Sequence, residues 1–187
     1  INSEEALANA WRAFLRSQPK IQHIPTKKEL LKLYHNLLKK NKLKKNPTLE
    51  KLLTKRAVRT LSGVAIITVL TKLFPCPGKC VYCPDEKQMP KSYISDEPAA
   101  ARALMLKFDP YEQVKQRIIS LEENGHPTDK IELIVKGGTW NAYPLDYQYW
   151  FVGRCFEAAN ETNIKERKKT VTELKKYLKF VSCVVFI

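Results

Sequence analysis

The sequence is poor in glycine, histidine and acidic residues. Six glycines among 187 residues, together with 44% hydrophobic residues, indicate a globular protein with a real core rather than a low-complexity chain. No apolar run is long enough to cross a bilayer, and the N-terminus lacks the charged and then apolar pattern of a secretory signal. We therefore expect no membrane partner and a cytoplasmic location.

Disulfides are not favoured either. The chain has five cysteines, an odd number, and three of them cluster, which argues against a disulfide framework in a reducing compartment. We interpret Cys155 and Cys183, which lie in apolar surroundings, as buried structural thiols. Because the chain starts with Ile1 rather than Met and stops within the apolar run FVSCVVFI, we expect it to be a piece of a longer protein.

Basic residues outnumber acidic ones, 33 to 19, and the excess is uneven. Residues 1–60 hold fifteen lysines and arginines against four acidic residues. This basic segment predicts a polyanionic partner, and nucleic acid is the first candidate because phosphate neutralisation drives most non-specific affinity. A solvated lysine-rich helical face and a juxtamembrane patch are the alternatives.

Helical patterns fill that basic segment. Apolar residues at helical spacing predict a helix over residues 4–16. Thr26 and Glu29 form a capping box that begins a second helix, which the run Lys39 to Pro47 ends. Thr48 is expected to open a short third helix.

The remainder predicts an α/β fold. Residues 63–71, GVAIITVLT, are β-branched and almost continuously hydrophobic, which is typical of a parallel strand covered on both faces. Further strands are expected over 131–136 and in the apolar ending. The order βαβαβ implies a parallel sheet. The first intervening helix is expected from Pro98 over AAARALML, with a starting signal at Asp96. A second is expected from Asp109-Pro110 to about Asn124. Two more are expected from Pro144 to about Asn160 and over 164–179.

A short loop, FPCPGKCVYCP, follows the first predicted strand. It places Cys76, Cys80 and Cys83 at the spacing C-x₃-C-x₂-C, so three thiolates can turn toward one metal centre. A zinc site needs a fourth ligand, yet all three histidines lie more than forty residues away along the chain. An open-site [4Fe–4S] cluster is therefore favoured over zinc and over a coincidental cluster of structural thiols. Active sites of open α/β sheets and barrels lie at this end of the strands.

The second predicted strand ends in Gly137-Gly138-Thr139. Consecutive glycines at this place let a ligand lie against the backbone, although a Gly-Gly pair alone is more often a turn.

These features together resemble the radical S-adenosylmethionine (SAM) superfamily, with Tyr82 before the last cysteine. More narrowly, the chain is similar to the catalytic subunit of Elongator and its single-chain prokaryotic relatives, which are tRNA wobble-uridine acetyltransferases. The similarity is dense from about Arg56 to Asn160 and drifts after Asn163. It lies in the strings RAVRTLSGVAIITVLTKLFPCPGKCVYCP, SYISDEPAAARALMLKFDPYEQVKQRI, GHPTDKIELIVKGGTW and YPLDYQYWFVGRCFEAAN.

The resemblance implies roles for individual residues. Cys76, Cys80 and Cys83 would hold the [4Fe–4S] cluster, and Gly137, Gly138 and Thr139 would meet the methionine end of SAM. Lys130 would bind acetyl-CoA, the co-substrate. The tRNA backbone would meet the basic residues Lys39, Lys40, Lys42, Lys44, Lys45, Lys55, Arg56 and Arg59.

The resemblance also implies a domain plan and a reaction. Residues 1–60 would be a basic helical tRNA-binding segment and residues 61–187 the first part of a radical SAM partial (β/α) barrel, with the C-terminal acetyltransferase domain absent. SAM cleavage would generate a 5′-deoxyadenosyl radical that activates acetyl-CoA for a carboxymethyl-type modification at C5 of the wobble uridine. An Elongator-like complex and a homodimer both stay open as assembly states.

Two other functions are compatible with the residues. One is a metal-stabilised RNA-binding module without catalysis. The other is a non-functional truncated product, which would aggregate through an exposed sheet edge.

Overall fold

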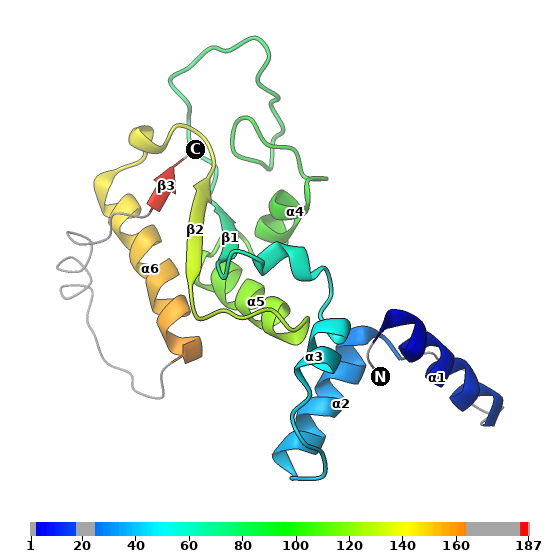
Figure 1. Ribbon diagram of the computed structural model, residues 1–187. Coiled ribbons are helices and arrows are strands. Elements are labelled where there is room, and N and C mark those ends of the chain that lie inside the picture. Colours follow the sequence, from blue (N-terminus) through cyan, green and yellow to red (C-terminus); the bar gives the residue numbers. More distant parts are fainter. Residues whose placement is uncertain (1–2, 18–24, 164–183, 187) are drawn as a thin grey trace. The chain divides into compact units, whose positions relative to one another are not determined.

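The computed structural model describes residues 3–17, 25–163 and 184–186, and its contacts divide the chain into two units (Figure 1). The helical unit comprises the described residues up to Gly63 together with Ser120–Thr128. The sheet unit comprises Val64–Ile119 and the described residues from Asp129 onward. Within the described ranges, no helix is both long and apolar enough to span a membrane. The division of the sequence after residue 60 did not foresee that Ser120–Thr128 join the first unit.

The helical unit contains the three expected helices. They are α1 (Glu4–Ser17), α2 (Lys27–Lys39) and α3 (Pro47–Leu53), followed by a 3-10 turn, η1 (Ala57–Thr60). The capping box is confirmed, because the Thr26 amide donates to the Glu29 carboxylate at 2.7 Å and the Glu29 amide donates to Thr26 Oγ1 at 3.3 Å. The predicted start of α3 at Thr48 is wrong by one residue. Asn46 caps this helix by accepting from the Leu49 amide at 3.1 Å, and Pro47 fits the first turn because its missing N–H needs no partner there.

A small core holds these helices together. Leu31, Tyr34 and Leu53 are buried, and Leu7 of α1 is among the residues packed against them. The Tyr34 hydroxyl also accepts from the Asn46 amide at 2.7 Å, which ties the start of α3 to α2. Burial of these apolar side chains, rather than helix propensity, therefore stabilises the three short helices.

The segment Ser120–Thr128 packs against these helices through polar contacts. The Lys55 amide donates to Asn124 O at 3.1 Å, and Thr60 Oγ1 lies 3.0 Å from His126 Nδ1. Lys28 of α2 forms an ion pair with Glu123 at 2.6 Å. Gly125 ends the preceding helix with φ +83°, where a Cβ would come within 2.9 Å of Leu31 Cδ2. Glycine is thus required here both by the backbone and by the close approach of α2.

The sheet unit is built on three parallel strands, as the sequence predicts. The order is β1 (Ala65–Leu70), β2 (Ile131–Lys136) and β3 (Val184–Phe186), with Ala65 paired to Ile131 and Leu133 paired to Val184. The expectation that the first strand is covered on both faces is wrong. Ile67 and Val69 are fully buried, whereas Ile66 is 47% exposed. Alternate side chains of a strand point to opposite faces, and the described residues leave this end of the second face partly exposed.

Helices connect the strands and make the described fold α/β. They are α4 (Pro98–Met105), α5 (Pro110–Glu123), the 3-10 turn η2 (Trp140–Ala142) and α6 (Leu145–Asn163). Asp109 caps α5 as expected, accepting from the Glu112 amide at 2.9 Å. Asp96 does not cap α4, because Glu97 occupies the N-cap position, without a side-chain hydrogen bond. The predicted helix over 164–179 and the thiol of Cys183 lie outside the described residues.

Candidate functional site

The cysteine loop, residues 71–97, begins at a firmly anchored strand end. Gln113 of α5 accepts from the Leu70 amide and donates to the Leu70 carbonyl, both at 2.9 Å. This buried side chain thereby pairs with the edge of β1 as a neighbouring strand would. The Thr71 amide then donates to Lys136 O at 2.9 Å, so the parallel ladder continues one residue past β1.

Two tyrosines from the segment after β2 fix the next residue. The Tyr143 hydroxyl donates to Lys72 O at 2.7 Å and lies 2.8 Å from Thr71 Oγ1, which must then be the donor. The Tyr147 hydroxyl accepts from the Lys72 amide at 3.0 Å. Burial raises the pKa of both phenols, so both stay protonated at neutral pH. The loop thus leaves the sheet from a defined position.

Beyond this anchor the loop extends past the arrowhead end of β2 (Figure 1) and carries all three predicted ligands. Cys76 and Cys83 are half-buried, Cys80 is exposed, and all three are free thiols. A Cβ placed on Gly78 would lie 3.6 Å from Cys76 Sγ and 3.7 Å from Cys80 Sγ. Two sulfurs therefore lie on either side of Gly78, although these are ordinary contact distances and space alone does not require glycine there.

Cys76 also meets the turn that follows β2. Its sulfur lies 3.3 Å from Thr139 Oγ1. The Thr139 hydroxyl, followed by the Gly78 amide, lowers the pKa of the Cys76 thiol, and the charge of Lys91 acts in the same direction. The thiolate, which is the form that binds metal, is therefore favoured. The structure thus brings together two residues that the sequence analysis assigned to one site.

The donor set fits a three-cysteine cluster in kind and number. The three thiols are free, reachable by solvent and carried by a loop without regular structure at the C-terminal end of β1. In this conformation they are not gathered around one point: among the described residues, no three His, Cys, Asp or Glu side chains could hold one metal ion. Thiolates repel one another, so a cation is what would draw the third sulfur toward the other two.

The two glycines after β2 have different surroundings. Gly137 has φ +154°, and a Cβ there would lie 1.8 Å from Thr71 Oγ1. A Cβ on Gly138 would find Tyr143 Oη as its nearest neighbour, at 3.8 Å, an ordinary contact distance. Internal packing against the end of β1 is thus enough to require glycine at 137, whereas space alone does not require it at 138.

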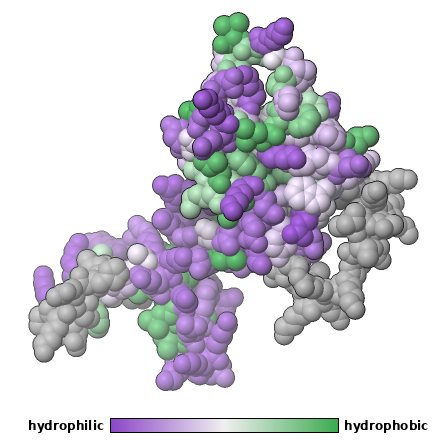
Figure 2. Space-filling view, turned by 180° about the vertical axis from the view of Figure 1, so that it is seen from behind, coloured by the Kyte–Doolittle hydropathy of each residue, from purple (hydrophilic) through white to green (hydrophobic). Residues whose placement is uncertain are grey.

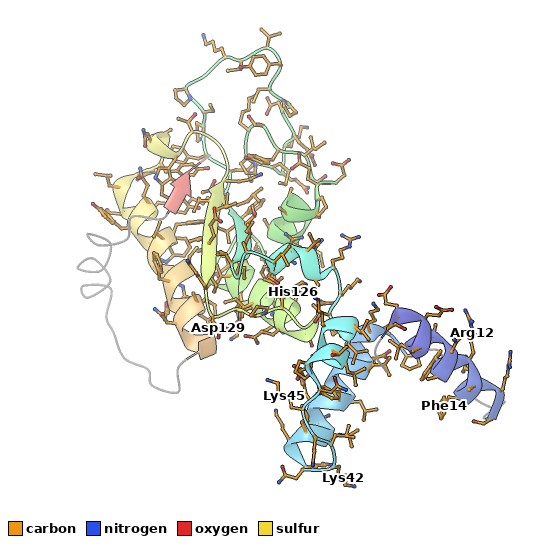
Figure 3. The ribbon with its side chains drawn as sticks, viewed as in Figure 1. Arg12, Phe14, Lys42, Lys45, His126 and Asp129 are labelled. Atoms are coloured by element: carbon orange, nitrogen blue, oxygen red, sulfur yellow. The ribbon has the colours of Figure 1, made fainter. Side chains whose placement is uncertain are left out.

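Lys130 does not join this group. It is exposed and immediately precedes β2, where its carbonyl accepts from the Ala65 amide at 2.8 Å. Figure 3 labels its neighbour Asp129 at this end of the strand. The six residues of β2 span about 20 Å, so the length of the strand separates Lys130 from the turn that begins at Gly137.

The predicted nucleic-acid-binding residues belong to the helical unit. Helix α2 ends in a Schellman turn, in which Asn41 has φ +53°, its amide donates to Leu38 O, and the Lys42 amide donates to Leu37 O, both at 2.9 Å. This turn directs the lysine run outward, and Figure 3 labels Lys42 and Lys45 along it. All eight predicted residues are exposed: Lys39, Lys40, Lys42, Lys44, Lys45, Lys55, Arg56 and Arg59. Hydrophilic side chains cover most of the visible surface of α1–α3 (Figure 2).

Several residues of the site were missed by sequence reasoning. Gln113, Tyr143 and Tyr147 anchor the loop from 43 to 75 positions away, and no local pattern signals such contacts. Ser92, whose hydroxyl lies 2.7 Å from Cys83 Sγ, is only nine positions from that cysteine. A serine in a short proline-bounded loop beside a metal-ligand motif was the signal that could have identified it.

Comparisons with known proteins agree on one group. No family model matches the sequence. The chain is 45% identical over 141 residues to a tRNA uridine(34) acetyltransferase of Methanocaldococcus infernus. The aligned region covers 71% of this chain and 26% of the relative. It is 37% identical over 128 residues to Elongator complex protein 3 of Bos taurus, covering 61% of this chain and 23% of the relative. A solved structure of the archaeal Methanocaldococcus infernus Elp3 with an N-terminal deletion shares 33% identity over 66% of this chain and 22% of that chain, at a TM-score of 0.42. The chain spans about a quarter of the length of the curated relatives it matches.

Proposed function

Because this chain is related by sequence to the tRNA uridine(34) acetyltransferases and to Elongator complex protein 3, we propose that it carries the iron–sulfur and tRNA-binding portion of an enzyme that modifies the tRNA wobble uridine at C5. The parent protein would be a cytoplasmic acyltransferase that uses radical SAM chemistry and acetyl-CoA, on a partial (β/α) barrel to which the three parallel strands belong. The observation that carries the proposal is the contact between Cys76 and Thr139, since it joins the cysteine loop to the turn after β2.

Different residues of this chain would bind the cluster, SAM and acetyl-CoA. Cys76, Cys80 and Cys83 would hold the cluster, and the amides and hydroxyl of Gly137, Gly138 and Thr139 would face the methionine end of SAM. When bound by three cysteines, a [4Fe–4S] cluster supplies one iron without a protein ligand and the electron needed for SAM cleavage. Lys130 would contribute its charge to acetyl-CoA at the other end of β2.

The helical unit would position the tRNA. Its eight exposed lysines and arginines can neutralise phosphates, and such contacts fix the register of a nucleic acid without reading its bases. The five lysines of the run lie within seven residues around the Schellman turn at Asn41, so they would act on neighbouring phosphates.

The proposal is tested on the full-length protein that contains this chain. After anaerobic reconstitution with iron and sulfide, we expect 5′-deoxyadenosine to be released from SAM, and mass spectrometry of digested tRNA to find a carboxymethyl-type uridine when acetyl-CoA is supplied. Both products should disappear when Cys76 is replaced by alanine. tRNA binding without any SAM cleavage would contradict the proposal and favour the RNA-binding module instead.

The lysine run gives a separate prediction about binding. Replacing Lys39, Lys40, Lys42, Lys44 and Lys45 together by glutamine should weaken tRNA binding at least tenfold near physiological salt. It should also flatten the log–log dependence of affinity on salt by roughly 0.9 for each phosphate that the segment no longer neutralises. Fluorescence anisotropy across a salt series measures both quantities. The matched control replaces the same five residues by arginine, which keeps the charge and should keep the slope. An unchanged slope in the glutamine variant would show that these lysines do not bind phosphates.

A further inference from the structure

We propose that Ser92 is a positioning residue for Cys83: its hydroxyl holds the third cluster ligand and raises the reduction potential of the cluster. The inference rests on the proposed function, because it concerns the same metal centre. It adds a residue outside the cysteine motif whose part in that centre is electrostatic.

The contact between the two side chains is direct. Ser92 Oγ lies 2.7 Å from Cys83 Sγ, and the Ser92 amide donates to Pro84 O at 3.3 Å. These two bonds close the chain between Pro84 and Ser92 into a small loop at the last ligand. Either atom can be the donor when Cys83 is a thiol, but a metal-bound thiolate has no proton, so the Ser92 hydroxyl would then donate to the sulfur.

This small loop is fastened to the rest of the sheet unit. Met89, near its middle, is 3% exposed and belongs to the core cluster that includes Leu70 and Ala100. On the outer side, the Ser95 amide donates to the Glu86 carboxylate at 2.8 Å. Because one side of the loop is buried and the other is hydrogen-bonded, Ser92 has a fixed position relative to the end of β1.

The backbone conformation of Ser92 favours a role for its hydroxyl group. Its φ is +78°, a left-handed conformation that glycine adopts freely and that costs a residue with a Cβ some strain. Glycine would therefore suit the turn better if the turn alone were needed. A serine that accepts this strain while its hydroxyl contacts a cysteine is consistent with a use for that hydroxyl.

A cation next to Ser92 reinforces the effect. Lys91 forms an ion pair with Asp85 at 2.6 Å, and its charge also interacts with Cys76 and Cys83. Hydrogen bonds and positive charge near thiolate ligands stabilise the more negative, reduced state of a cluster, which raises its reduction potential. The hydroxyl of Ser92 and the ammonium of Lys91 therefore act in the same direction.

The test compares two substitutions of Ser92 in the reconstituted full-length protein, using EPR-monitored redox titration, iron content and urea unfolding. Ser92→Ala and Ser92→Gly should both retain iron and shift the midpoint potential to more negative values. Ser92→Gly should also be at least as stable as wild type because the strain at φ +78° is relieved. Ser95→Ala is the matched control: it removes a side-chain hydrogen bond to Glu86 of the small loop without touching a cysteine, and its potential should stay at the wild-type value.

The outcomes separate three cases. Unshifted potentials in both Ser92→Ala and Ser92→Gly would overturn the inference, as would an equal shift in Ser95→Ala. A wild-type protein that takes up no iron–sulfur cluster would overturn the proposed function and this inference with it. A wild-type protein that holds its cluster, with midpoint potentials unshifted in both Ser92→Ala and Ser92→Gly, would overturn this inference and leave the proposed function standing.

Discussion

Replacing Cys80 by alanine is expected to abolish iron–sulfur loading while changing tRNA affinity by less than about twofold, because phosphate contacts dominate that affinity. Cys80 is exposed on the cysteine loop and is absent from the apolar clusters of the described residues, so its replacement removes the proposed ligand without removing packing. The residues proposed to bind tRNA all belong to the helical unit. Iron and sulfide analysis, with the visible absorption spectrum, measures the first effect, and fluorescence anisotropy with labelled tRNA measures the second.

Cys155 provides the matched control for this substitution. It is 1% exposed on α6, where burial raises the pKa of its thiol and keeps it neutral. Cys155→Ala should lower the free energy of unfolding by about 1 kcal/mol and leave iron loading intact. If Cys80→Ala instead unfolds the protein and abolishes tRNA binding, the cysteines are structural and the RNA-binding module is the better description.

Replacing Gly137 by alanine is expected to lower the free energy of unfolding by about 2–5 kcal/mol, through overpacking and backbone strain together. The new Cβ would lie 1.8 Å from Thr71 Oγ1 and 3.1 Å from Thr71 Cβ, so the end of β1 would have to move. That end carries the anchor of the cysteine loop, since Thr71 also contacts Tyr143. Urea unfolding measures the loss of stability, and iron content should fall with it.

Two further variants show whether the predicted clash is the cause. Gly138→Ala meets no atom closer than 3.8 Å and should change stability by less than about 1 kcal/mol. Combining Thr71→Ala with Gly137→Ala should cost less than the sum of the two single changes, because the truncated side chain no longer presses on the new Cβ. Additive effects, or a Gly137→Ala variant as stable as wild type, would show that Thr71 does not crowd position 137 in this way.

Local patterns predicted the elements that carry the site. The capping box at Thr26 and Glu29 and the β-branched run of β1 each depend on neighbouring residues, so the sequence was enough to place them. The spacing of the three cysteines likewise predicted a shared loop at the end of β1.

Contacts between distant segments could not be predicted. A helix ending near Asn124 was predicted, but nothing in its pattern indicated that Ser120–Thr128 packs on α2 and α3 through Gly125 and Glu123. Gly137 looked like a ligand-facing glycine, whereas the side chain opposite it is Thr71. Such pairings depend on how two surfaces meet in three dimensions, and hydrophobic periodicity carries no information about that.

The position of Lys130 illustrates the same limit. The resemblance assigned Lys130 to acetyl-CoA, and the parallel register places this residue beside Ala65, at the start of the strands and away from the cysteine loop. A long, flexible ligand such as acetyl-CoA could extend along β2 from Lys130 to the turn that begins at Gly137, whereas a compact ligand could not reach both. The order of residues along β2 is readable from the chain itself, but only the register shows which neighbours each end has.

The central claim is that Cys76, Cys80 and Cys83 hold a cluster with one iron open to SAM. EPR spectroscopy of the anaerobically reconstituted, dithionite-reduced protein, recorded with and without SAM, tests it most directly. We expect a [4Fe–4S] signal whose shape changes when SAM is added, because SAM would bind the iron that lacks a cysteine. No cluster signal, or a cluster signal that SAM leaves unchanged, would contradict the claim.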